Sequence, residues 1–250
     1  MAEVLPDLDP LIELLGVDRR VVVLVGLGFA RDHDAEQHVE GGDWARRGNL
    51  EALLTDPAAF WEFYLPLATE IAARTPSAGH TAIAQLQRAG VIWKVIAQSA
   101  DRLLTKAGVQ DVVEVHGNVV SSRCDRCGER YGIPEVEVLI ASSPDGVPRC
   151  TTDGCGYPVR PSGTLWGETL PEEPVRRAWA LAAEADTFVV CDSSLRTTPV
   201  SLLPSVPLTR GIPLAIVGRT ATQYDRYATV IQAPAEPVMV ALAARLAPGT

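Results

Sequence analysis

Residues Val21-Val22-Val23-Leu24-Val25-Gly26-Leu27-Gly28 form a run of branched apolar side chains that ends in a glycine turn. A run without polar alternation predicts a strand buried on both faces, as in the centre of a parallel sheet. Further short apolar runs at 91–96, 112–115, 187–191 and 214–217 predict strands, and patterns at 81–89, 175–184 and 237–246 predict helices. Strands that alternate with helices predict an α/β fold with a mostly parallel sheet.

Two regions interrupt this alternation. Residues 32–76 contain no convincing strand, and Asp56 followed by Pro57 is typical of a capped helix start. We therefore predict a helical insertion there. Residues 117–162 are rich in cysteine, glycine, proline and arginine with little periodicity. Such a composition predicts a small module without an apolar core of its own.

The overall charge excludes some classes of partner. The 250 residues carry 31 acidic and 22 basic side chains, a formal net charge of −9. General nucleic-acid binding and binding to anionic membranes both need a clustered positive field, so neither is expected. The apolar runs are far shorter than the roughly 20 residues that span a bilayer. The first residues also lack the basic and apolar segments of a signal peptide, so we predict a cytoplasmic protein.

Four of the five cysteines form two closely spaced pairs, Cys124-x2-Cys127 and Cys150-x4-Cys155. Two such turns can direct four thiolates at one ion, which predicts a closed tetrahedral site for structural zinc. Two disulfides or unrelated thiols are the alternative, although disulfides are uncommon in a chain without a secretory signal. Cys191 ends a buried strand and is interpreted as a small core residue.

Several motifs in one order make the chain resemble the sirtuin family. The matching segments are Gly26-Leu27-Gly28, the helix from Asp56 to Tyr64, Pro76 to His80, Val95 to Asp101, Glu114 to Gly117, the four cysteines, Arg160-Pro161, Trp166 to Pro171 and Ser193-Ser194-Leu195. The resemblance implies a Rossmann-like parallel-sheet large domain with an inserted small zinc-ribbon module and a helical insertion. The corresponding ranges are 1–31, 77–116 and 163–250 for the large domain, 32–76 for the insertion and 117–162 for the zinc module.

The resemblance also implies a reaction and a set of site residues. Sirtuins transfer the acyl group of an acyl-lysine to the ADP-ribose of NAD, with a histidine as general base. His116 occupies the position of that histidine, and histidine is suited to proton transfer near neutral pH. The positions that correspond to cofactor-binding residues are Gly26, Gly28, Gln98, Ser99, Asp101, Ser193 and Ser194.

Other positions depart from the family pattern. Val25 replaces a threonine, and Ser99 replaces the asparagine that organises nicotinamide cleavage. Asp192 brings a negative charge toward the expected phosphate position. Further departures lie at Ala30, Gln37-His38-Val39, Leu104, Gly218 and Gly163-Thr164, where the last pair replaces an apolar clamp for the acyl chain. If about five hydrogen bonds of roughly 1 kcal/mol each are absent, NAD binding weakens over a thousandfold.

These departures favour a divergent enzyme that keeps His116 as general base but acts on a non-standard small-molecule or acyl substrate. An ordinary NAD-dependent protein-lysine deacylase and a catalytically inactive nucleotide or ADP-ribose sensor or scaffold are the alternatives. His33 and His38 could lie near His116 in one pocket, although loop histidines are more often surface residues. Similarly, Arg31, Arg46 and Arg47 are interpreted as a solvated face rather than a phosphate site, and His80 as structural.

Overall fold

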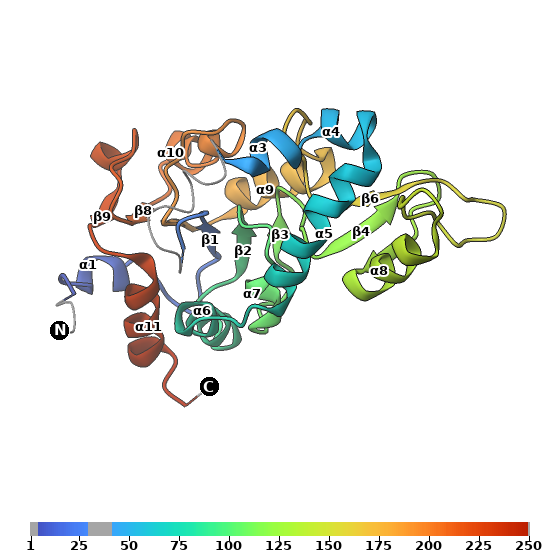
Figure 1. Ribbon diagram of the computed structural model, residues 1–250. Helices are drawn as coiled ribbons and strands as arrows, with labels where there is room; N and C mark the ends of the chain where they lie inside the picture. The colour runs from blue at the N-terminus through green and yellow to red at the C-terminus, as the bar shows by residue number, and fades with distance from the viewer. Residues whose placement is uncertain (1–4, 30–41, 250) are drawn as a thin grey trace.

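The computed structural model describes residues 5–29 and 42–249. Within these ranges, six strands form one parallel sheet in the order β3-β2-β1-β7-β8-β9 (Figure 1). Their bounds are β1 Val21–Val25, β2 Lys94–Ala97, β3 Val113–Glu114, β7 Thr187–Cys191, β8 Leu214–Val217 and β9 Thr229–Ile231. The sequence therefore predicted β1, β7 and β8 with correct limits, but it placed the start of β2 three residues early. The α/β, parallel-sheet fold class is confirmed.

The central strand β1 is buried along its whole length, as its uninterrupted apolar run predicts. Val21, Val23 and Val25 face one core cluster, and Val22 and Leu24 face the other. Residues of α1, α6, α7 and α11 build the first cluster, while α9 and α10 contribute to the second. The bounds are α1 Asp9–Ile12, α6 Ala78–Arg88, α7 Leu103–Lys106, α9 Glu172–Glu184, α10 Ser205–Thr209 and α11 Ala235–Leu246.

The predicted helical insertion contains α3 (Asp43–Arg47), α4 (Leu50–Thr55) and α5 (Pro57–Ala73) in its described part. The predicted start of α5 is confirmed, because Asp56 Oδ1 accepts a hydrogen bond of 3.0 Å from Ala59 N and Pro57 takes the first helical position. The aromatic side chains of α5 then form a buried stack in which Phe60 and Tyr64 rings lie 5.3 Å apart.

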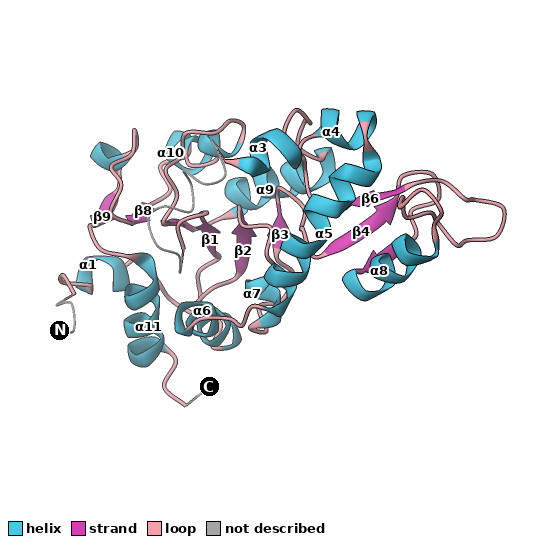
Figure 2. Ribbon diagram, in the orientation of Figure 1, coloured by secondary structure: helices cyan, strands magenta, loops and turns pink. Residues whose placement is uncertain are grey.

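The cysteine-rich module contains more regular structure than its composition predicted. Its antiparallel sheet has the order β5-β4-β6, with β4 Ser121–Cys124, β5 Arg130–Gly132 and β6 Val159–Pro161, and helix α8 spans Ile133–Ser142 (Figure 2). Ile133 and Val136 of α8 share one core cluster with the α5 aromatics. The module therefore shares its apolar core with the helical insertion, in agreement with the expectation that it has none of its own. The residue limits of the three parts stay a prediction.

No helix in the described part of the chain is long and apolar enough to cross a membrane. The predicted absence of general nucleic-acid binding and the predicted cytoplasmic location stay predictions.

Candidate active site

The candidate site lies where the strand order reverses. From β1 the chain proceeds to β2 and β3 on one side, and β7, β8 and β9 follow on the other. In doubly wound sheets, ligands bind outside the carboxyl ends of the strands at this switch point. Here the turn after β1 lies against the end of β7, since Gly26 N donates to Cys191 O at 2.7 Å and Gly28 N donates to Asp192 O at 3.2 Å.

Gly26 is required by this close approach. A β-carbon added at Gly26 would lie 2.1 Å from Asp192 O, whereas one at Gly28 would lie 3.1 Å from the same atom. We predict that Gly26→Ala lowers the free energy of unfolding by about 3 kcal/mol or more, because two backbone segments must separate. Gly28→Ala is the matched control and should cost about 1 kcal/mol or less, since its neighbour needs to shift by only a few tenths of an ångström. Equal losses in urea unfolding would contradict this account.

A pocket opens beside this turn at the ends of β7 and β8. It contains about 560 Å³ of space, a volume that includes open solvent at its mouth. Its lining residues are Gly28, Asp192, Ser193, Ser194, Ile216, Val217, Gly218, Arg219, Thr220 and Pro234. The pocket therefore brings together three of the predicted cofactor-binding residues: Gly28, Ser193 and Ser194. Their role in binding a cofactor stays a prediction.

Of the other four predicted cofactor residues, Gly26 lies on the turn after β1, and Gln98, Ser99 and Asp101 lie on the loop between β2 and α7. Ser193 Oγ donates to Gln98 Oε1 at 2.6 Å, so the loops after β2 and β7 are joined directly. Ser99 Oγ donates to Asp101 Oδ2, and Asp101 Oδ1 accepts from Leu103 N at 2.9 Å. Gln98, Asp101 and Ser193 are buried. These hydrogen bonds hold a wall of polar side chains in place at the carboxyl ends of β2 and β7.

His116 follows β3 and is oriented by the same loop. Its Nδ1 lies 2.7 Å from Gln98 O, and because a carbonyl only accepts, Nδ1 carries the proton and Nε2 is the basic nitrogen. Burial lowers the pKa of His116 below its ordinary value, and the hydrogen bond to Gln98 opposes this only in part. The imidazole is therefore neutral at pH 7 and can accept a proton at Nε2.

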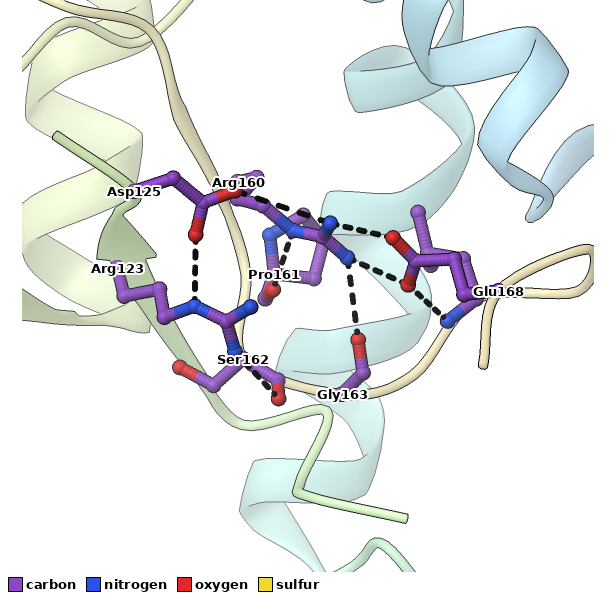
Figure 3. Close-up of polar contacts among 8 residues, drawn as sticks. Arg123, Asp125, Arg160, Pro161, Ser162, Gly163 and Glu168 are labelled. Carbon is purple, nitrogen blue, oxygen red and sulfur yellow. Dashed lines mark hydrogen bonds and ion pairs between the residues drawn. The ribbon is translucent and has the colours of Figure 1, made fainter. Parts of the chain in front are cut away.

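A mostly buried ion pair between Arg160 and Glu168 holds the segment that follows β6 (Figure 3). Arg160 forms a bidentate pair with Glu168, with 2.7 Å between Nη2 and Oε2, and the two side chains are only 13% and 15% exposed. Glu168 also accepts from Leu165 N at 2.8 Å. Burial would raise the pKa of Glu168, but these hydrogen bonds leave it below its ordinary value. The pair thereby fixes the turn from Leu165 to Glu168. Thr164 directly precedes this turn, and its N–H donates to His116 O at 2.8 Å.

The four paired cysteines converge as predicted. Their Sγ atoms all lie within 4.8 Å of one another, with 3.6 Å between Cys124 and Cys155 and 3.5 Å between Cys127 and Cys150. Tetrahedral zinc with Zn–S bonds of about 2.3 Å needs sulfur atoms about 3.8 Å apart, so the cluster fits this ion. Cys191 lies instead in the sheet core, as expected.

Other sequence-based interpretations have separate outcomes. Arg46 is exposed and pairs with Asp43, in agreement with a solvated face. The interpretation of His80 as structural is confirmed, because its Nδ1 and its backbone N–H bond to Ser77 at the start of α6. Arg31, His33 and His38 lie outside the described residues. Sequence reasoning missed Arg219 and Thr220, which line the pocket directly after the buried strand β8.

Comparisons with known proteins identify the family. The Sir2 family model matches residues 40–199. An NAD-dependent protein deacetylase of Haloarcula marismortui is 34% identical over 96% of this chain and 94% of its own length, and NAD-dependent protein deacetylase 1 of Geobacillus kaustophilus is 32% identical over 87% and 88%. Among solved structures, Sir2 bound to acetylated peptide superposes with a TM-score of 0.81 at 27% identity, covering 96% of this chain and 98% of that one.

These findings correct the main functional prediction. The expectation that most NAD and acyl-lysine motifs are lost, and that the substrate is non-standard, is wrong, because full-length relatives at this identity are NAD-dependent protein deacetylases. The prediction counted the loss of side-chain hydrogen bonds one position at a time, whereas the pocket is lined by segments at the ends of three strands, β1, β7 and β8. Asp192, expected only to repel phosphate, instead bonds through Oδ2 to Ala235 N at 2.8 Å, at the positive start of α11. The chain belongs to the Sir2 family.

Proposed function

We propose that this protein is an NAD-dependent deacylase of acyl-lysine side chains in proteins. The observation that carries the proposal is a continuous set of hydrogen bonds from the pocket to His116, through Ser193, the Gln98 side chain and the Gln98 carbonyl. The relatives support the substrate class, since they are NAD-dependent protein deacetylases, and related Sir2 structures contain acetylated or propionylated peptides. One such structure contains a peptide together with NAD+.

The residues present fit the cofactor. Ser194 and Thr220 offer hydroxyls for ribose and phosphate at the pocket, and Arg219 adds a cation there. When bound, NAD would supply an electrophilic ribosyl carbon with nicotinamide as its leaving group. His116 Nε2 would accept the proton of a ribose hydroxyl. Gln98 O accepts a hydrogen bond from the other ring nitrogen, Nδ1. This bond keeps Nε2 unprotonated and fixes the orientation of the ring.

Release of nicotinamide tests this function directly. The purified protein is incubated with NAD and a lysine peptide in its free, acetylated or propionylated form, and nicotinamide is measured over time. We expect release with the acylated peptides and only background with the free-lysine peptide, because the acyl oxygen is the nucleophile. Release that is independent of acylation, or absent with both acyl chains, would reject the proposal.

The acid limb of the pH profile should report His116. Because burial lowers its pKa, the neutral base persists down to a pH below about 6.5 and is lost as pH falls further. We predict that kcat/KM for the acetylated peptide is flat from pH 8 to about 6.5 and declines tenfold per pH unit at more acidic pH. The measurement is a series of initial rates in overlapping buffers. A decline that begins above pH 7 would contradict the lowered pKa.

A further inference from the structure

The pocket at β7 and β8 lies across the switch point from His116. In the sheet order, β3 and β8 are separated by four strand intervals, which at about 4.8 Å each amounts to about 19 Å. An extended dinucleotide can bridge such a separation. If its reacting ribose lies at His116, its adenosine half extends toward the pocket, where the described lining side chains can contact the adenosine ribose.

Asp192 is the acidic residue among the described lining residues of this pocket. Its position is fixed by three neighbouring elements. Its N–H donates to Val217 O of β8 at 2.8 Å, its carbonyl accepts from Gly28 N, and its Oδ2 accepts from Ala235 N at the start of α11. The backbone adopts a left-handed φ of 45°, which asparagine and aspartate tolerate better than most residues. The backbone bonds fix the main chain here, and the carboxylate cannot rotate away without losing the hydrogen bond from Ala235 N.

The space beside this carboxylate is left open by Gly218. A β-carbon at position 218 would lie 3.3 Å from Asp192 Oδ1, so a side chain there would crowd this oxygen. Glycine at position 218 avoids this crowding. A carboxylate accepts several hydrogen bonds at once, so it can bind neighbouring hydroxyls while it caps a helix.

We propose that Asp192 binds the hydroxyls of the adenosine ribose and thereby selects NAD over NADP. The inference rests on the proposed function and assigns one of its specificity-determining residues. In other nucleotide-binding parallel sheets a carboxylate also holds the ribose 2′-hydroxyl. A 2′-phosphate in the same place would bring two negative charges against a fixed carboxylate, which disfavours its binding strongly.

The test is a calorimetric titration of the full chain with NAD and with NADP. We expect the wild-type protein to bind NAD at least about a hundredfold more tightly than NADP. Asp192→Asn keeps an oxygen for Ala235 N and tolerates the left-handed backbone, so it should fold normally while losing the charge. In this variant the two affinities should fall within about tenfold of each other, mainly through tighter NADP binding.

Glu236→Gln is the matched control. Glu236 also lies at the start of α11, where its Oε1 accepts from Gly79 N, but it does not line the pocket. The control should keep the wild-type preference. Equal binding of NAD and NADP by the wild type, or an unchanged preference in Asp192→Asn, overturns the inference and leaves the proposed function standing. Failure of the wild type to bind either nucleotide overturns both.

Discussion

Replacing His116 with alanine is expected to lower the rate of peptide deacylation by about 10²–10⁴-fold, the range that a positioned general base contributes. The ring is neutral because burial lowers its pKa, and the carbonyl of Gln98 assigns the proton to Nδ1. Alanine removes the imidazole that is placed here to take the hydroxyl proton. Binding of NAD should change little, since His116 does not line the pocket at β7 and β8. Initial rates and titration calorimetry measure the two effects separately.

His80→Gln, at another histidine of the described residues, is the matched control for His116→Ala. Glutamine at the third helical position preserves the capping arrangement with Ser77, so this variant should keep both fold and rate. A His116→Ala enzyme that retains more than a tenth of the wild-type rate would show that another group removes the proton. Loss of NAD binding in the same variant would point to a structural role instead.

Loss of one zinc ligand should have the second large effect. Cys150→Ser is expected to abolish stoichiometric zinc binding and to unfold the cysteine-rich module. Four thiolates within 4.8 Å repel one another without a cation, and metal binding in small zinc modules contributes about 10–16 kcal/mol. The α5 aromatics share a core cluster with this module, so Phe60, Trp61 and Tyr64 become exposed as well. Zinc analysis and tryptophan fluorescence measure these changes.

Cys191→Ala is the control for this experiment. Cys191 is a buried core residue on β7 and does not belong to the cysteine cluster, so the variant should retain one zinc per chain. It should lose only a small packing contribution, about 1 kcal/mol. Full zinc content in Cys150→Ser, or equal zinc loss in both variants, would contradict a four-cysteine structural site.

The central strands and the cysteine cluster could be predicted from the sequence because their signals are local. An uninterrupted run such as Val21–Val25 occurs where both faces of a strand are buried, and β1 is buried throughout. Short cysteine spacings place thiolates on single turns, and the four sulfur atoms meet. The cap at Asp56 is equally local, since it depends on residues three positions apart.

Contacts between distant segments could not be predicted in this way. Helix α8 was missed because its apolar residues serve a core shared with α5, which no short-range pattern reveals. The pair of Arg160 and Glu168 depends on the path of the turn between them. Asp192 was interpreted only as a charge in the pocket, because its bond to Ala235 joins residues 43 positions apart. Substitutions at single positions were therefore a poor guide to whether the site binds NAD.

The most direct test of the account is the stoichiometry of products from NAD and an acetyl-lysine peptide, followed by mass spectrometry. The account predicts equal amounts of nicotinamide, free-lysine peptide and acetylated ADP-ribose, all absent when the peptide lacks its acetyl group. Deacetylated peptide without nicotinamide release, or consumption of NAD without transfer of the acetyl group, would contradict it.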